Sequence, residues 1–182
     1  YGNNGTNSGN TNAVGRVAGA QGFNGIAFVE LGNNGSLNVT NALTISSWLY
    51  ANTVSSWSFA YGAGWTGWEW KIDYGIVESP PGSKKWGLEI KNNAILAGGA
   101  AVTSEWHNIV YVLDPDNNLQ SLYDNGVRVA TNSGTALGSA NAADTFRLGS
   151  KYDNTTTWNG LIDEFRVSST ARSSITTNCH GC

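Results

Sequence analysis

The sequence is poor in charge, cysteine, methionine and proline, and these shortages exclude several classes of protein. Only 13% of the 182 residues are charged, with 10 basic against 13 acidic side chains and no cluster of Lys and Arg. Such a chain is poorly suited to bind nucleic acid or an anionic membrane surface. No apolar run approaches the roughly 18 residues that cross a bilayer. We therefore expect neither a nucleic-acid partner nor membrane insertion.

Aromatic residues and glycine are abundant instead. Aromatic residues reach 11%, eight of them are Trp, and Gly contributes 23 residues. A hydrophobic fraction of 40% is too high for a disordered chain, and the length fits one domain with its own core. The chain begins with Tyr1 rather than Met, which indicates a processed protein or an excised domain.

Short β-branched or aromatic segments alternate with turn sequences, which is typical of strands and not of helices. In Leu43–Tyr50, for example, every second residue is suited to a buried face, while Ile109–Leu113 is apolar on both sides, as a central strand should be. The Asn125-Gly126 pair between two such segments predicts a tight hairpin. We predict strands at Gly22–Leu31, Leu43–Tyr50, Trp57–Tyr61, Trp68–Tyr74, Trp86–Ile90, Trp106–Leu113, Leu119–Tyr123, Val127–Thr131, Thr145–Leu148 and Gly160–Ser168. Many short strands without a helix predict an all-β antiparallel sandwich or barrel.

Four segments carry a resemblance to a known family. They are FNGIAFVELGNNGSLNVTNALTISSWLY (Phe23–Tyr50), WHNIVYVLD (Trp106–Asp114), LYDNGVRVAT (Leu122–Thr131) and WNGLIDEFRVSSTARS (Trp158–Ser173). In this order they resemble the LamG-like, concanavalin A-like lectin/glucanase superfamily. The resemblance implies an antiparallel two-sheet jelly-roll sandwich on a secreted, extracellular or cell-surface protein. Members bind glycans, bind proteins or act as spacers, so the fold alone leaves the function open.

The resemblance covers nearly the whole chain. We expect one jelly-roll domain at residues 1–173, followed by a tail at 174–182. The tail holds Cys179 and Cys182 in a Cys-x-x-Cys pattern. A local disulfide, a link to another chain and a small metal site all fit that spacing, and metal is the weakest of the three.

The resemblance also implies a structural calcium ion. Asp163 matches a position that often helps to hold calcium in related jelly rolls, and Asn24 or a loop carbonyl would be its partner. Calcium needs six or more oxygen ligands. The alternative is that Asp163 and Glu164 pair with Arg166 or Arg147 across the sheet.

A catalytic site is not apparent in the sequence. Glycosidases need two carboxylates about 5–9.5 Å apart. Glu69 and Asp73 have the parity to share a face of a strand, but at about 3.3 Å per residue they lie near 13 Å apart. Glu89 is alone on its strand, and adjacent Asp163 and Glu164 point to opposite faces. We therefore expect a protein that is not an enzyme.

The tryptophans are more informative. Trp48, Trp86 and Trp106 coincide with positions that the family fills with core aromatic residues, and Trp158 is expected to cover a sheet edge. The remaining rings gather in one Gly-rich segment, where Trp65, Trp68 and Trp70 are the expected ligand contacts, with Tyr61, Lys71 and Asp73 as polar neighbours. Exposed indole rings stack on pyranose rings, and polar neighbours bond the hydroxyls. The segment predicts a polysaccharide or other glycan as the partner.

A second hypothesis needs no glycan. The few charges, the abundant Asn, Gly, Ser and Thr and the terminal cysteines also fit a self-assembling extracellular subunit of a filament, sheath or adhesin. Such a subunit would add a strand at an exposed sheet edge and bind other copies of itself. Trp65 and Trp68 would then be buried against a neighbouring copy instead of lining an open groove.

Overall fold

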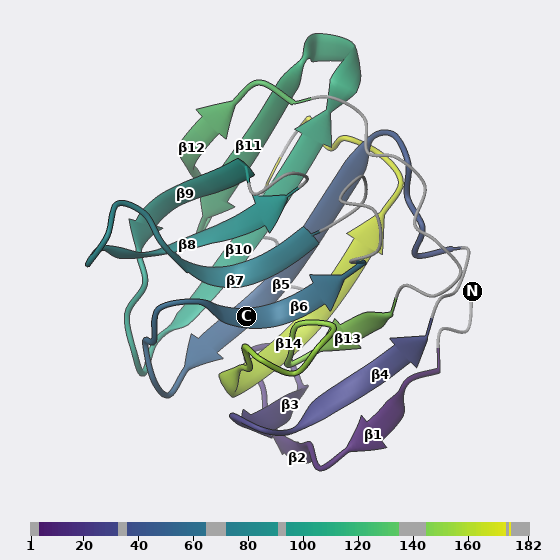
Figure 1. The fold of residues 1–182 in the computed structure, drawn as a ribbon, viewed down its shortest axis with the longest axis vertical. Coiled ribbons are helices and arrows are strands. Elements are labelled where there is room, and N and C mark those ends of the chain that lie inside the picture. The colour runs from purple at the N-terminus through teal and green to yellow at the C-terminus, as the bar shows by residue number, and fades with distance from the viewer. Residues whose placement is uncertain are drawn as a thin grey trace.

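The protein is an antiparallel β-sandwich. The computed structural model describes residues 4–32, 36–64, 72–90, 94–134, 145–173 and 175. These residues form two sheets of seven strands each, which lie face to face and cross at a clear angle (Figure 1). One 3-10 turn, η1 (Pro115–Asn117), is the only helical element among them, and none of the described segments is a helix capable of spanning a membrane. The predicted all-β two-sheet fold is confirmed.

Each sheet combines strands from both halves of the chain. Sheet A contains, in spatial order, β1 (Thr6–Ser8), β4 (Phe28–Gly32), β13 (Phe146–Leu148), β6 (Ser58–Ala63), β7 (Ile72–Glu78), β8 (Lys84–Ile90) and β9 (Ala94–Ala100). Sheet B contains β12 (Val127–Asn132), β11 (Leu119–Asp124), β10 (Trp106–Asp114), β5 (Leu43–Ala51), β14 (Asn159–Ser168), β3 (Gly19–Asn24) and β2 (Thr11–Val14). Sheet A faces the viewer in Figure 1.

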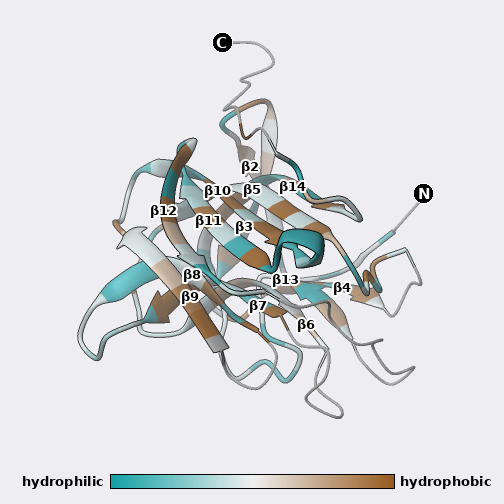
Figure 2. Cartoon of the chain, turned by 90° about the horizontal axis from the view of Figure 1, so that it is seen from above, coloured by the Kyte–Doolittle hydropathy of each residue, from teal (hydrophilic) through white to brown (hydrophobic). Residues whose placement is uncertain are grey.

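The core lies between the two sheets and follows from the alternation of their strands. Leu43, Ile45 and Leu49 on β5 are 0–1% exposed and point inward, as the period of two requires. Strand β10 is buried on both faces from Ile109 to Leu113, which confirms its prediction as a central strand. Hydrophobic and hydrophilic segments alternate along strands of both sheets in Figure 2.

One tyrosine connects the two sheets by hydrogen bonds. Tyr74 on β7 is fully buried, and its hydroxyl donates to the carbonyl oxygen of Ile109 on β10 at 2.7 Å. The Ser47 hydroxyl on β5 lies 3.0 Å from the Tyr74 hydroxyl oxygen. Burial raises the pKa of Tyr74 well above its ordinary value, so the phenol stays neutral and able to donate.

The single predicted strand at Gly22–Leu31 is wrong, because the chain turns in its middle and passes from sheet B to sheet A. Asn24 Oδ1 accepts hydrogen bonds from the amides of Ile26 and Ala27, and Gly25 has a φ of 88°. An Asn-Gly pair readily forms this turn. The result is two strands, β3 and β4, in different sheets.

The other predicted strands correspond to β5 to β8 and β10 to β14. The predicted strand at Trp68–Tyr74 is described only from Ile72 onward. Strands β1, β2 and β9 were not predicted, since they contain Asn, Ala and Gly, which have little intrinsic strand preference, and these strands pair here through tertiary contacts. The predicted hairpin at Asn125-Gly126 is confirmed, with φ angles of 50° and 82°.

The tryptophan assignments are only partly correct. Trp86 and Trp158 are both fully buried in the core with ring centroids 6.4 Å apart, so the expectation that Trp158 covers a sheet edge is wrong. Trp48 and Trp106 are half-buried on the outer face of sheet B, and assigning them to the core was also wrong. Successive side chains of a strand point to opposite faces, so these two rings lie on the face away from the inward-pointing residues of β5 and β10.

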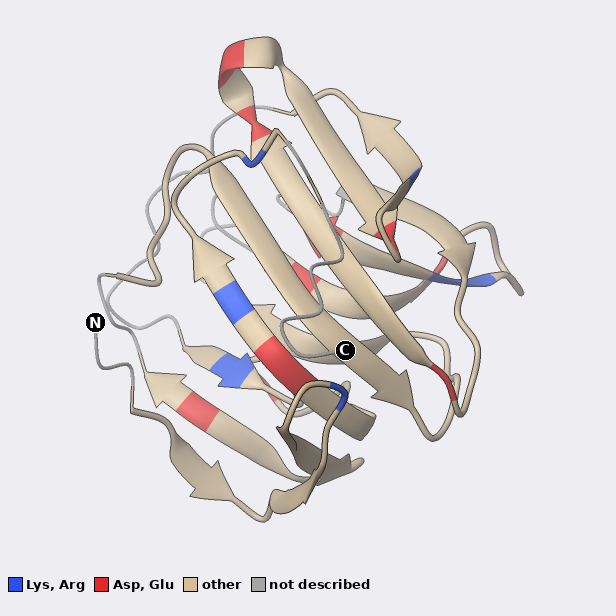
Figure 3. Cartoon of the chain, turned by 180° about the vertical axis from the view of Figure 1, so that it is seen from behind, with Lys and Arg blue, Asp and Glu red and all other residues tan. Residues whose placement is uncertain are grey.

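The two central strands of sheet B carry little charge. Strand β5 carries no charged residue, and Asp114, at the end of β10, is the only Asp, Glu, Lys or Arg of that strand (Figure 3). The rings of Tyr50 and Trp106 lie 5.4 Å apart on the outer face of this sheet. Substitutions of these half-buried rings therefore serve as controls for substitutions of aromatic residues on the opposite face of the sandwich.

Candidate functional site

A row of polar side chains crosses the outer face of sheet A. Strand register places Glu30 opposite Arg147, Arg147 opposite Gly62, Gly62 opposite Asp73 and Asp73 opposite Glu89. Residues that are directly paired across a sheet point to the same face. The neighbouring residues of β6 and β7 point into the core, so this row faces away from it.

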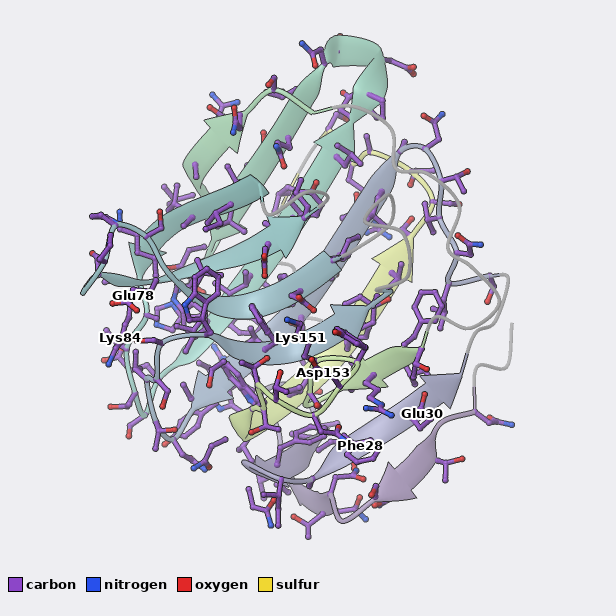
Figure 4. All side chains as sticks on the ribbon, in the orientation of Figure 1. Phe28, Glu30, Glu78, Lys84, Lys151 and Asp153 are labelled. Atoms are coloured by element: carbon purple, nitrogen blue, oxygen red, sulfur yellow. The ribbon has the colours of Figure 1, made fainter. Side chains whose placement is uncertain are left out.

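The segment at residues 149–157, which we call the Tyr152 loop, packs on this row at its centre. Gly62 allows the close approach, since a Cβ there would lie 2.6 Å from Lys151 Cα and 2.7 Å from the Ser150 carbonyl oxygen. Asp73 is 0% exposed beneath the loop. Figure 4 shows Lys151 and Asp153 on the side of sheet A that faces the viewer.

Lys151 connects the loop to the sheet. Its Nζ lies 4.0 Å from Asp73 Oδ2 and 5.6 Å from the centroid of the Tyr152 ring. Desolvation, followed by the charges of Asp153 and Asp73, raises the pKa of Tyr152 to about 12. The half-exposed phenol is therefore neutral throughout the neutral pH range, and its hydroxyl is hydrogen-bonded to Asp153.

Asp153 is held in its ionised form within the loop. Partial burial opposes ionisation, but the hydroxyl and amide of Thr155 donate to Asp153 Oδ1 at 2.6 and 3.0 Å. These hydrogen bonds and the charge of Lys151 outweigh the burial and lower the pKa of Asp153 below its usual value. An exposed carboxylate thus lies beside the Tyr152 ring at neutral pH.

Arg147 fastens the other end of the loop. Its Nε donates to Glu30 Oε2 at 2.6 Å, and its Nη1 donates to the Tyr152 carbonyl oxygen and, at 3.0 Å, to Asn154 Oδ1. The guanidinium also lies 4.7 Å from the centroid of the Phe28 ring. Since these groups come from β4, β13 and the loop, the folded sandwich fixes the loop conformation (Figure 4).

The resulting surface combines an aromatic ring with hydrogen-bonding groups. We define the Tyr152 surface as Lys151, Tyr152, Asp153 and Asn154, which are half-buried or exposed. Its amine, phenol, carboxylate and amide groups lie beside a ring face, and contacts within the protein hold them in place. Such a surface is suited to bind a molecule that has apolar C–H faces and many hydroxyl groups.

The site predicted from the sequence lies partly in this region. Asp73 belongs to the polar row, but it is 0% exposed beneath the Tyr152 loop, so its prediction as a polar ligand neighbour is wrong. Tyr61 is 1% exposed in the core, with its ring 4.9 Å from that of Phe165, so its prediction as a polar ligand neighbour is wrong. Four predicted contacts belong to the connection between β6 and β7 and lie outside the described residues: Trp65, Trp68, Trp70 and Lys71.

Two features of the region were missed in the sequence. Glu89 was treated as a lone acid, yet it lies directly opposite Asp73 on the neighbouring strand. The Tyr152 loop was not singled out in the sequence. Its residues 151–157, Lys-Tyr-Asp-Asn-Thr-Thr-Thr, place an aromatic residue among hydrogen-bonding side chains, and that pattern was the available signal.

The predicted calcium ligands do not converge. Asp163 Oδ2 accepts hydrogen bonds from the amides of Arg16 and Val17 at 2.8 and 2.9 Å. Asn24 pairs with Asn159, four residues from Asp163 along β14, which is about 13 Å. Among the described residues no three His, Cys, Asp or Glu side chains gather in a metal-binding cluster. Asp163 and Asn24 therefore do not form a common calcium site.

The alternative expectation for these acids is correct in part. Glu164 and Arg166 form an ion pair on β14, whereas Arg147 pairs with Glu30. The predicted disulfide residues Cys179 and Cys182 lie outside the described residues.

The chain belongs to the concanavalin A-like lectin/glucanases superfamily. The model of that family matches residues 23–175, most of the chain. A search of curated proteins finds no match. The resemblance inferred from the four sequence segments is confirmed.

Solved structures share the fold at low sequence identity. Domain 4 of an extracellular GH43 arabinanase from Geobacillus stearothermophilus, solved with arabinotriose, is 20% identical with a TM-score of 0.68, covering 90% of this chain and 77% of that domain. The CBM40 of the Ruminococcus gnavus IT-sialidase, bound to α2,3-sialyllactose, is 19% identical with a TM-score of 0.60, covering 74% and 79%. A heptameric pentraxin from Limulus polyphemus is 13% identical with a TM-score of 0.58, covering 75% and 68%. At these identities the similarity concerns the fold.

Proposed function

We propose that this chain is a non-catalytic carbohydrate-recognition domain of a secreted or cell-surface protein. The observation that carries the proposal is the Tyr152 surface, where a half-exposed ring lies among fixed hydrogen-bonding groups on the outer face of sheet A. Pyranose and furanose sugars present C–H groups for stacking and hydroxyls for hydrogen bonds. The proposal is supported by relatives of the same fold that hold arabinotriose or sialyllactose.

The Trp-rich connection between β6 and β7 completes the proposed site. It leaves sheet A after Gly64 and returns at Ile72, one residue before Asp73. We propose that Trp65, Trp68 and Trp70 provide further stacking faces and that Lys71 bonds hydroxyls. No nucleophile or accessible carboxylate pair is part of this proposal, because Asp73 is buried and Lys151 lies beside it.

Single substitutions test the site. Tyr152→Ala and Trp68→Ala should each weaken retention on polysaccharide affinity gels about tenfold or more, since a stacked aromatic contact and its hydrogen bonds contribute on the order of 1–3 kcal/mol. Trp106→Ala is the matched control, because this half-buried ring lies on the outer face of sheet B. It should leave retention unchanged, and circular dichroism would establish that all three variants fold.

Two results would contradict the proposal. One is unchanged retention of both Tyr152→Ala and Trp68→Ala on a gel that retains the wild-type protein. The other is loss of retention only in Trp106→Ala, which would assign glycan binding to sheet B.

Self-assembly is the second candidate function. Val14 on β2 and Val127 on β12 are 86% and 66% exposed, and both strands lie at edges of sheet B. Exposed apolar residues on edge strands favour pairing with another chain. Size-exclusion chromatography with light scattering distinguishes the two functions, because an assembly subunit should elute as an oligomer that Val14→Lys dissociates.

A further inference from the structure

The charges around the Tyr152 surface select the class of glycan that it binds. Its two described cations, Arg147 and Lys151, both lie next to carboxylates of the same sheet. Among the described residues of this region, the carboxylates are Glu30, Asp73 and Glu89 on sheet A and Asp153 in the Tyr152 loop. We infer that the surface binds neutral glycans and rejects those that carry carboxylate or sulfate groups; this inference rests on the proposed function.

Arg147 already interacts with several groups within the protein. It donates to Glu30, to Asn154 and to the Tyr152 carbonyl oxygen, and its plane lies against Phe28. The side chain is only 16% exposed. An anionic sugar would compete for this guanidinium with Glu30, which is an intramolecular partner at high effective concentration.

Lys151 is similarly engaged. Its side chain is 16% exposed, and its amine lies 4.0 Å from the Asp73 carboxylate. That carboxylate is fully buried and would lose its nearby cation if the amine turned toward a ligand. Separating the amine from a buried carboxylate is unfavourable, so Lys151 is a poor receptor for a second anion.

Asp153 adds repulsion at the position where a ligand would stack. It is exposed, it follows Tyr152 directly, and its hydrogen bonds keep it ionised at neutral pH. A ligand carboxylate within about 6 Å would be disfavoured roughly tenfold at intermediate dielectric values. The chain as a whole carries a formal charge of −3, which acts in the same direction.

A panel of neutral and acidic probes tests the inference. NMR titration of the wild-type protein would compare arabinotriose, cellotriose and lactose with 3′-sialyllactose and tri-galacturonic acid at low ionic strength. We expect at least one neutral probe to bind about tenfold more tightly than either acidic probe. Equal or tighter binding of an acidic probe would overturn the inference and leave the proposed function intact. Failure of every probe in this panel and on a broad glycan array would overturn the proposed function, and the inference with it.

A charge-removing substitution tests the cause. Asp153→Asn should raise the ratio of the affinity for 3′-sialyllactose to the affinity for the best neutral probe severalfold. Asp116→Asn is the matched control, because it removes the same charge from η1, outside the site. If both variants change the affinity for sialyllactose equally, net charge and not the Tyr152 surface sets the selectivity, and the inference is wrong.

Discussion

Substituting Gly62 by Ala tests how the Tyr152 loop is held on sheet A. The new Cβ would lie 2.6 Å from Lys151 Cα and 2.7 Å from the Ser150 carbonyl oxygen, both of them backbone atoms. Ordinary carbon–carbon contacts are near 3.5–4.0 Å, so the loop must move by about 1 Å. The backbone of Gly62 needs no positive φ, and the expected effect is therefore steric.

The size of that effect follows from the contacts that the movement disturbs. Lys151 donates its amide to the Thr156 carbonyl oxygen at 2.9 Å, and its amine lies beside Asp73. Overpacking of this kind costs about 1–3 kcal/mol. For a domain of this size, a loss of about 2 kcal/mol lowers the Tm by about 4–8 °C.

Differential scanning calorimetry provides the assay, and Gly19→Ala is the matched control. Gly19 also lies in a strand without a positive φ, and its added Cβ would meet only the Ala13 carbonyl oxygen, at 4.0 Å. We expect that control to change stability by less than about 0.5 kcal/mol. If Gly62→Ala and Gly19→Ala melt at the same temperature and bind glycan equally, the loop does not pack on Gly62 and the structural basis of the site is wrong.

Three further predictions concern the core, the loop charge and the expected calcium ion. Tyr74→Phe should destabilise the protein by about 1–3 kcal/mol in urea unfolding, because the carbonyl of Ile109 and the hydroxyl of Ser47 lose their buried partner; an unchanged unfolding midpoint would refute the link between the sheets. The folded-state pKa of Asp153 is below its usual value, so its contribution to stability is present above about pH 4 and is lost as the pH falls through the folded pKa. The Tm of Asp153→Asn should accordingly fall less than that of the wild type between pH 5 and 2, and parallel curves would contradict this assignment. Asp163→Ala should lower the Tm by the same amount in calcium and in chelator, since it removes the acceptor of two backbone amides. If calcium raises the Tm of the wild type but not that of Asp163→Ala, Asp163 is instead a calcium ligand.

The comparison of Trp48 with Trp86 shows where sequence patterns succeed and where they mislead. The alternation within the predicted strand Leu43–Tyr50 placed Trp48 on the face opposite Leu43, and the structure shows that this face is the outer one. Family resemblance nevertheless assigned both tryptophans to the core. The alternation of side chains along a strand shows which residues share a face. Packing against the second sheet decides which of the two faces is buried.

Local sequence by itself determined the strand-rich class, most strand positions, the Asn125-Gly126 hairpin and the shortage of charge. These properties depend on side-chain period and turn chemistry over a few residues. Only the tertiary structure decided that Asp73 faces Glu89, that Gly62 supports Lys151 and that Arg147 bonds Glu30 across 117 residues of chain. Such contacts depend on strand order and register, which join distant segments, so no local pattern could specify them.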